Sequence, residues 1–182
     1  MSEALLVIDM QKDVLEWMVP AGNDVLSNVK LVLEAFRDSG KPVVHILRVH
    51  AADGSDVEVF RRRMFSEKPY LVRGTSGAEV VGELAPLETE HVVEKQRFSA
   101  FFQTGLKHLL DSIGVDTLIV VGVQTPNCVR CTVTDAVSHD YKVILVRDAV
   151  AAATPEIHEA NLLDLGNMGV ELRTVEDIVN SV

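Results

Sequence analysis

Short runs of apolar residues recur along the chain, and the segments between them follow a different periodicity. Each run is continuous rather than alternating, which is typical of a strand buried on both faces of a sheet. Two of the segments between runs place apolar residues at i, i+3, i+4 and i+7 and are followed by a glycine, which predicts amphipathic helices over residues 25–36 and 106–113. The six predicted strands are residues 4–8, 43–47, 92–93, 118–121, 143–146 and 170–172.

Predicted strands and helices alternate through the whole chain. Parallel strands need long crossover connections, and these connections place helices on both faces of the sheet. The pattern therefore predicts a doubly wound α/β domain. The length of 182 residues and the apolar content of 47% suffice for a core that needs no disulfide or metal, so we expect residues 1–182 to form a single domain.

One segment, residues 51–82, interrupts the alternation. It contains Asp53-Gly54-Ser55-Asp56 and Gly74-Thr75-Ser76-Gly77, which break any long period. Long connections of this kind often carry function, and we interpret the segment as a lid over a site. The alternative is a plain surface insertion with a short helix over residues 56–64.

Acidic residues outnumber basic ones by 27 to 17, which gives a formal charge of −10. This charge repels nucleic-acid phosphates and anionic lipid head groups, so we expect neither nucleic acid nor a membrane as a partner. The two cysteines lie three positions apart, the start lacks the features of a signal peptide, and no apolar run approaches the roughly 18 residues of a membrane span. We therefore expect a cytoplasmic protein.

Three reactive side chains lie just beyond predicted strands, where the ligand crevice of a parallel sheet is found: Asp9, Lys95 and Cys128. Asp9 and Lys95 are expected to pair, because either charge alone is costly to bury. Thr125 is expected to cap the next helix with Pro126 in its first turn, so that the helix dipole lowers the pKa of Cys128. Taken singly, each residue also fits a structural role, as a core cysteine or an ordinary ion pair.

The stretches around these three residues match a known family over the length of the chain. The chain resembles the isochorismatase-like cysteine hydrolases, which include nicotinamidases and N-carbamoylsarcosine amidohydrolases. The resemblance implies a three-layer α/β/α sandwich around a six-stranded, Rossmann-like parallel sheet. The matching stretches are LVIDMQ at 6–11, KQRFSAF at 95–101 with Thr104, GVQTPNCV at 122–129 with Thr132 and Asp135-Ala136, and Asp148-Ala149.

By this resemblance, Asp9, Lys95 and Cys128 form a catalytic triad that hydrolyses a small amide or ureide through a thioester acyl-enzyme. Asp9 takes the proton from Cys128, and Lys95 holds Asp9 and favours the thiolate. The backbone N–H groups of Gln124 and Cys128 form the oxyanion hole. The family also has a cis peptide bond before the residue that matches Gln124, so we expect a cis bond between Val123 and Gln124.

The chain departs from the nicotinamidases at their metal site. The matching stretch reads Arg48-Val49-His50, with Arg48 in place of a metal-binding acid, and a cation there opposes a divalent metal. We therefore expect no metal and no other cofactor. Arg48 and His50 are instead candidates for binding the substrate, together with Gln11 and Phe101 from the matching stretches. Alternatively, Arg48 pairs with an acid of the lid and His50 is exposed.

Two other functions fit parts of the sequence. Cys128 and Cys131 form a C-x-x-C pair at a helix start, as in thiol-disulfide oxidoreductases, but this interpretation leaves Asp9 and Lys95 without a role. A non-catalytic binding protein on the same scaffold is the second alternative. We favour a hydrolase of a small-molecule amide or ureide, and the resemblance further implies a homo-oligomer, a dimer or higher.

Overall fold

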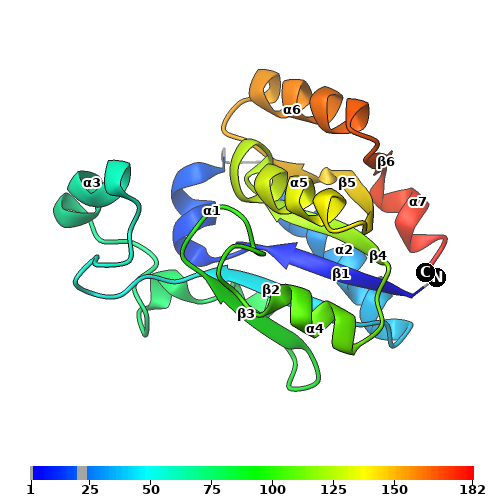
Figure 1. The fold of residues 1–182 in the computed structure, drawn as a ribbon, viewed down its shortest axis with the longest axis horizontal. Coiled ribbons are helices and arrows are strands. Elements are labelled where there is room, and N and C mark those ends of the chain that lie inside the picture. Colours follow the sequence, from blue (N-terminus) through cyan, green and yellow to red (C-terminus); the bar gives the residue numbers. More distant parts are fainter. Residues whose placement is uncertain (1, 20–23) are drawn as a thin grey trace.

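The computed structural model, which describes residues 2–19 and 24–182, is built around one six-stranded parallel sheet (Figure 1). The strand order is β3-β2-β1-β4-β5-β6, and each neighbouring pair is parallel. Each predicted strand has a counterpart at the same place in the chain. The order reverses between β1 and β4, so the crevice of this doubly wound sheet lies at the carboxyl ends of these two central strands. The strands are β1 (Glu3–Ile8), β2 (Val43–Arg48), β3 (His91–Lys95), β4 (Thr117–Val123), β5 (Lys142–Ala151) and β6 (Glu171–Arg173).

Helices cover both faces of the sheet, so the molecule has three layers. Leu5 and Val7 of β1 belong to a core that includes residues of α2 and α7, whereas Leu6 and Ile8 belong to a core with residues of α4, α5 and α6. This is the predicted α/β/α sandwich. Within the described part of the chain, no helix has the length and apolar character of a membrane span. The helices are α1 (Lys12–Met18), α2 (Val25–Asp38), α3 (Arg62–Glu67), α4 (Leu106–Ser112), α5 (Arg130–Ser138), α6 (Pro155–Asn167) and α7 (Val175–Val179).

The two helices predicted from apolar periodicity are α2 and α4. All five apolar positions that define the period of α2 are buried. In α4, Leu106 and Leu110 are buried, and the other apolar positions of the pattern pack partly buried against the same core. Gly40 and Gly114 follow the two helices with φ of 67° and 69°, a conformation that glycine adopts without a steric cost.

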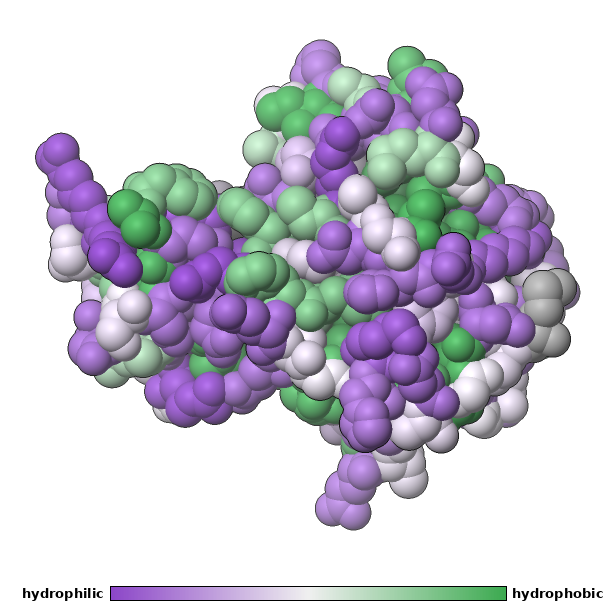
Figure 2. Space-filling model, in the orientation of Figure 1, coloured by the Kyte–Doolittle hydropathy of each residue, from purple (hydrophilic) through white to green (hydrophobic). Residues whose placement is uncertain are grey.

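Residues 51–82 leave the sandwich beyond the carboxyl end of β2 and form the lobe that carries α3, at the left of Figure 1. In the space-filling view, the visible face of this lobe is mainly hydrophilic, with a few apolar side chains among the polar ones (Figure 2). Two short 3-10 turns, Ser76–Ala78 and Gly82–Leu84, lead the chain back toward β3. The lobe therefore lies at the end of the sheet where the ligand crevice is expected.

The short helix expected over residues 56–64 begins later than the sequence indicates. A 3-10 turn at Val59–Arg61 leads directly into α3. The delay has a local cause, because Asp56 Oδ2 accepts a hydrogen bond from the Ala51 N–H at 3.0 Å and so closes a loop. Glu58 then has an extended backbone, with φ of −56° and ψ of 141°, and the first turn follows it.

A buried polar cluster ties α2 to the edge of the sheet. The side chain of Glu90 is 6% exposed, accepts hydrogen bonds from Arg37 Nε at 2.6 Å and Nη2 at 2.9 Å, and lies 2.8 Å from His45 Nε2. Burial alone would raise the pKa of Glu90, but the hydrogen bonds from Arg37, from the Leu87 N–H and from His45 lower this pKa to about 2.

Replacing Glu90 with Gln is expected to lower the free energy of unfolding by about 2–3 kcal/mol near pH 7. Because the pKa of Glu90 in the folded protein lies below its ordinary 4.5, the stabilisation is fully present above about pH 4.5 and is lost as the pH falls toward about 2. Urea unfolding at about pH 7, 5 and 3 measures this dependence, with the exposed neighbour Glu88→Gln as control. A loss of equal size at all three pH values would contradict the assignment.

Candidate active site

The carboxyl ends of β1, β3 and β4 bring Asp9, Lys95 and Cys128 together. Lys95 Nζ lies 2.8 Å from Asp9 Oδ2, and both side chains are buried. Lys95 Nζ also donates to the Arg97 carbonyl at 3.3 Å, so the ammonium group is held from two sides. Asp9 and Cys128 line the same small cavity, and the charge of Asp9 acts on the Cys128 thiol. The structure thus places the three residues in one cluster, in which Lys95 pairs with Asp9 and Asp9 lines the same cavity as Cys128.

The backbone around the cluster has several unusual conformations. Asp9 has a φ of 50°, and its N–H donates to a carbonyl oxygen of β2 at 2.9 Å. The peptide bond between Val123 and Gln124 is cis, as the resemblance implied. A π-helical turn, Thr125–Val129, follows directly and carries Cys128 at the mouth of the crevice.

The prediction that Thr125 caps this turn is wrong. Gln124 occupies the N-cap position with an extended backbone, and the Thr125 hydroxyl lies 3.0 Å from Nδ1 of His158 instead. Pro126 lies in the first turn, as predicted. The turn begins at Thr125, one position earlier than predicted, because the extended backbone ends at Gln124. His158, which no sequence motif singles out, therefore connects α6 to the loop that carries Cys128.

The surroundings of Cys128 raise its pKa, contrary to the expectation from the helix dipole. Burial of the thiol is the largest cause, and the neighbouring Asp9 adds to it, so that the pKa stands at about 11 instead of 9.0. Lys95 and Arg48 act in the opposite direction without overcoming burial. The thiol is therefore protonated at neutral pH, and its ionisation needs a base within reach. Asp9 lines the same cavity as the thiol.

Arg48, the last residue of β2, lies over the thiol. Its Nη1 donates to Glu58 Oε1 at 2.7 Å, and its Nη2 lies 3.8 Å from Cys128 Sγ. Arg61 approaches the same Glu58 oxygen at 3.9 Å. The guanidinium groups of Arg48 and Arg61 lie 5.1 Å and 4.9 Å from the centre of the Phe98 ring. Arg48 thus lies beside the sulfur of Cys128, where a residue that contacts the substrate was expected. It also forms the alternative that the sequence left open, an ion pair with an acid of residues 51–82.

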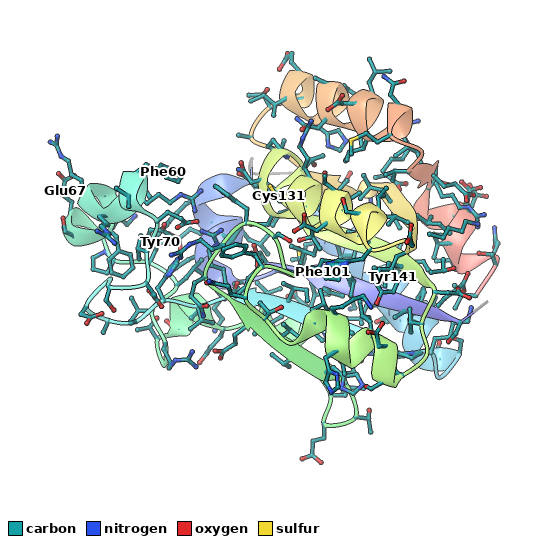
Figure 3. The ribbon with its side chains drawn as sticks, viewed as in Figure 1. Phe60, Glu67, Tyr70, Phe101, Cys131 and Tyr141 are labelled. Carbon is teal, nitrogen blue, oxygen red and sulfur yellow. The ribbon has the colours of Figure 1, made fainter. Side chains whose placement is uncertain are left out.

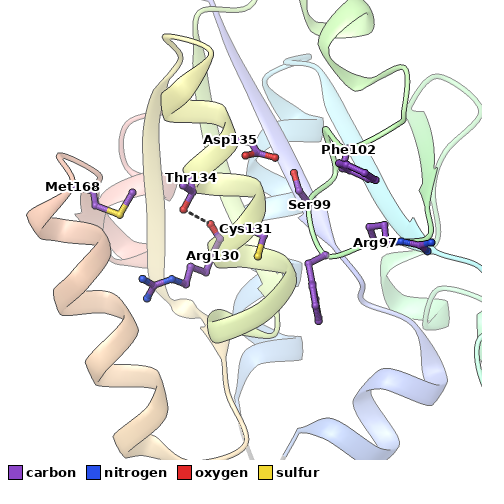
Figure 4. Close-up of a pocket in the computed structure, with 9 residues that line it drawn as sticks. Arg97, Ser99, Phe102, Arg130, Cys131, Thr134, Asp135 and Met168 are labelled. Carbon is purple, nitrogen blue, oxygen red and sulfur yellow. Dashed lines mark hydrogen bonds between the residues drawn. The ribbon is translucent and has the colours of Figure 1, made fainter. Parts of the chain in front are cut away.

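The space beside the thiol is small. The cavity next to Cys128 has a volume of about 20 Å³, which holds about one water molecule. A hollow of about 590 Å³ opens elsewhere, between the loop that carries Phe102 and the α5 residues around Cys131, and it contains no residue of the triad (Figure 4). The reactive groups therefore place the site at the smaller cavity. Its lining includes Asp9, Arg48, Arg61, Tyr70, Gln124, Asn127 and Cys128.

Two of the other substrate-binding candidates, Gln11 and Phe101, do not line this cavity. Gln11 is fully buried; its amide donates to the carbonyls of Arg48 at 2.9 Å and Ala78 at 2.8 Å and accepts from the Arg48 N–H at 2.9 Å. It therefore ties the end of β2 to the lobe. Phe101 lies beside Tyr141, with ring centres 6.1 Å apart, on the part of the molecule away from α3 (Figure 3).

His50 is fully buried, which corrects the expectation that it is exposed. Its Nδ1 lies 3.2 Å from Asp56 Oδ1, and its ring packs edge-on against Phe65 and Tyr70. Burial and the nearby Arg48 lower the pKa of His50. His50 does not line the cavity beside Cys128 and instead packs inside the base of the lobe.

The candidate site does not fit a metal ion. In the part of the chain that the structure describes, no group of three or more His, Cys, Asp or Glu side chains is placed to hold one. At the position where the resemblance points to a metal-binding acid stands the buried cation Arg48, with its guanidinium directed at Glu58 and at the thiol. A positive charge at this position opposes a divalent cation.

Three residues at the site have no motif that marks them in the sequence: Glu58, Arg61 and Tyr70. All three belong to the lobe, which has no periodicity. Arg61 and Tyr70 line the cavity and Glu58 pairs with Arg48 only because the chain folds back over the end of the sheet. Asn127, by contrast, lies in a matching stretch, and its Nδ2 donates to Gln124 Oε1 at 3.0 Å.

Comparisons with known proteins identify the family. The model of the isochorismatase domain matches residues 3–177. The chain is 46% identical to a protein of Arabidopsis thaliana named a probable inactive nicotinamidase, over 96% of this chain and 93% of that protein. It is 34% identical to a maleamate amidohydrolase of Pseudomonas putida, over 83% of this chain and 71% of that enzyme. The crystal structure of an isochorismatase family protein from Desulfovibrio vulgaris superposes with a TM-score of 0.91 at 39% identity, covering 98% of this chain and 97% of that one. The chain therefore belongs to the isochorismatase family of hydrolases.

Proposed function

We propose that the chain hydrolyses the C–N bond of a small amide or ureide, with Cys128 as nucleophile, Asp9 as general base and Lys95 as the partner of Asp9. The observation that carries the proposal is the buried Lys95–Asp9 pair, 2.8 Å apart, set against a thiol whose pKa is raised. A buried ion pair is weak evidence for stability alone. Beside a protonated nucleophile, the same pair supplies the base that the nucleophile needs.

The proposed reaction begins with transfer of the thiol proton of Cys128 to Asp9. The sulfur attacks the carbonyl carbon, and the negative charge moves to the carbonyl oxygen, to which the backbone N–H groups of Gln124 and Cys128 donate. Asp9 gives the proton to the leaving nitrogen, the C–N bond breaks, and a thioester remains. A water molecule that loses its proton to Asp9 then attacks the thioester, and the C–S bond breaks. Asp9 returns the proton to the sulfur of Cys128, and the acid product leaves.

We further propose that residues 51–82 are the lid of this site. Glu58 and Arg61 come from this segment and lie at the cavity or against the arginine that lines it. A space of about 20 Å³ does not admit an amide larger than about one water molecule. Entry of a substrate therefore requires side chains of this segment to move. Assembly into a homo-oligomer stays a prediction.

Replacing Cys128 with Ala is expected to reduce ammonia release from small amides and ureides to the background rate, because no thioester can form. Purified protein is assayed on a panel that includes nicotinamide, maleamate, ureidoacrylate and an N-carbamoyl amino acid, with and without a chelator. Release that depends on Cys128 and is unaffected by the chelator agrees with the proposal. Release that persists in the Cys128→Ala protein would refute the assignment of the nucleophile.

Cys131→Ser is the matched control, since it removes the second thiol three positions along the same helical segment. Cys131 lines the separate large hollow, so this variant is expected to keep the amide-hydrolysing activity. Loss of activity in both cysteine variants, together with reduction of insulin disulfides by the native protein, would instead indicate a dithiol oxidoreductase. Absence of any turnover, with tight binding of a panel member, would indicate a binding protein on this scaffold.

A further inference from the structure

Several buried polar atoms around the cavity have no hydrogen-bond partner among the described residues. They are Asp9 Oδ1, Arg48 Nε, Glu58 Oε2 and the Tyr70 hydroxyl oxygen. Asp9 Oδ1 has a role in the proposed reaction, in which the Asp9 carboxylate accepts the proton of Cys128. Arg48 Nε and Glu58 Oε2 belong to the Arg48–Glu58 pair, and Tyr70 lines the same cavity as Arg48. A buried unsatisfied group costs about 1–3 kcal/mol. Such a cluster indicates a place for a ligand with polar groups of its own.

The charge of the cavity favours an anion. Asp9, Arg48 and Arg61 are the charged residues that line it. Lys95 neutralises Asp9 from behind, and Glu58 neutralises one of the two arginines. One positive charge is left over, inside a protein whose formal net charge is −10. An anionic ligand would be balanced at this cavity and repelled by most of the remaining surface.

The Arg48–Glu58 pair itself has the form of a carboxylate-binding contact. A guanidinium group presents a planar set of donors that matches two carboxylate oxygens, yet here Nη1 donates to one Glu58 oxygen and the other oxygen is unpartnered. The Arg48–Glu58 pair therefore uses only one of the two carboxylate oxygens of Glu58. A ligand carboxylate that uses both oxygens would make a better contact with Arg48 than Glu58 does.

We propose that Arg48 determines substrate specificity by binding a carboxylate of the substrate, which displaces Glu58 of the lid. The inference rests on the proposed function and narrows its substrate class to short amides or ureides that carry a carboxylate. Arg48 Nη2 lies 3.8 Å from Cys128 Sγ, so the carboxylate and the reacting carbonyl are separated by only a few bonds. The Tyr70 hydroxyl, which lines the same cavity, supplies a further donor. Release of Glu58 also frees the space that the closed cavity lacks.

The kinetic test compares maleamate and succinamate with their neutral methyl esters. Replacing Arg48 with Gln is expected to lower kcat/KM for the acids by about 100-fold, mainly through KM, since a charge-assisted contact in a desolvated site is lost. For the esters we expect a smaller loss of kcat/KM, within about tenfold, because they carry no carboxylate and lose only the effect of the Arg48 charge on the Cys128 thiol. Glu58→Gln is expected to lower KM for the acids, because the competitor of the substrate carboxylate is removed. Arg63→Gln is the matched control: this lobe arginine is 91% exposed and its substitution changes the net charge equally.

Two kinetic results would overturn the inference. In the first, the native protein hydrolyses the esters as well as the acids. In the second, Arg48→Gln lowers both to the same extent, which would make Arg48 a structural part of the lid contact. Cys128-dependent release of ammonia from either set would support the proposed function in each case, so failure of the inference can be told apart from failure of the function.

A binding test covers the case in which no panel amide is hydrolysed. Maleate and succinate are titrated calorimetrically into the Cys128→Ala protein and into the same protein with Arg48→Gln or Arg63→Gln added. We expect binding that is lost with Arg48→Gln and kept with Arg63→Gln. Binding of this kind without hydrolysis would support the carboxylate site and contradict the proposed function. No binding at millimolar concentration, or binding independent of Arg48, would overturn the inference.

Discussion

Replacing Asp9 with Asn is expected to lower kcat for amide hydrolysis by about 1000-fold, in the range found when a general acid–base group is removed. Asparagine preserves the shape of the side chain, but it cannot accept the proton of Cys128 or return it to the leaving nitrogen. The substitution also leaves the fully buried Lys95 without its counter-ion. Steady-state kinetics on an amide that the native protein hydrolyses measures the loss. A kcat within tenfold of the native value would remove Asp9 from the mechanism.

The same variant has a second readout that a merely damaged site would not show. Asp9 raises the pKa of Cys128 through its charge, whereas Lys95 and Arg48 lower it. Asp9→Asn is therefore expected to move this pKa below about 11. Alkylation by iodoacetamide, followed against pH in a Cys131→Ser background so that one thiol reports, should reach its midpoint at a lower pH. Thiol reactivity then increases while turnover decreases, and a parallel loss of both would contradict the role of Asp9 as base.

A double substitution separates catalysis from folding. Lys95→Met leaves the buried Asp9 carboxylate unpaired, which is expected to cost about 3–5 kcal/mol of folding free energy. Asp9→Leu combined with Lys95→Met replaces both charges with apolar groups and is expected to recover most of that loss without any recovery of activity. Thermal or urea unfolding of the two variants tests this. A double variant as unstable as Lys95→Met alone would indicate that the pair is needed for the fold itself.

The strands could be predicted to different degrees because their surroundings differ. The central strands β1 and β4 are covered on both faces, and their continuous apolar runs mark them clearly in the sequence. The edge strand β3 has only two adjacent apolar residues, one of which, Val92, is 48% exposed, so only a fragment of it could be identified. The start of α3 could not be predicted at all, because it depends on a loop that Asp56 closes through the Ala51 N–H.

The triad residues could be singled out because parallel strands bring their carboxyl ends to one edge. The direction of the Cys128 pKa shift could not be obtained in this way. The helix dipole is a local effect of about 0.3–1 kcal/mol at exposed positions, and it is visible in the sequence as a turn with Pro126. Burial of the thiol and the approach of Asp9 act more strongly, and both exist only in the assembled fold. Glu58 could not be identified from the sequence for the same reason, since its contact with Arg48 is created by the path of the lobe.

Replacing Gly122 with Ala is expected to lower the free energy of unfolding by at least about 4 kcal/mol. A loss of this size is exceptional and points to a severe local disruption such as a backbone clash. Gly122 of β4 lies opposite Ile8 of β1 at the centre of the sheet. A Cβ at this position would stand 2.1 Å from the Ile8 carbonyl oxygen and 2.7 Å from the Ile8 nitrogen, and the φ of 110° is itself unsuited to a side chain. The two central strands would have to separate. Ile8 precedes Asp9, so any protein that still folds should also lose activity.

Gly169→Ala provides the matched control for the backbone conformation. Gly169 has a φ of 90°, but a Cβ there would meet no atom within 4 Å. Its substitution is expected to cost only about 1–2 kcal/mol, the penalty of the left-handed conformation. Urea unfolding of both variants, with soluble yield as a second measure where Gly122→Ala cannot be purified, gives the comparison. Equal losses in the two variants would show that the close approach of β1 and β4 does not constrain this position, and that Asp9 and Gln124 are held in place by other contacts.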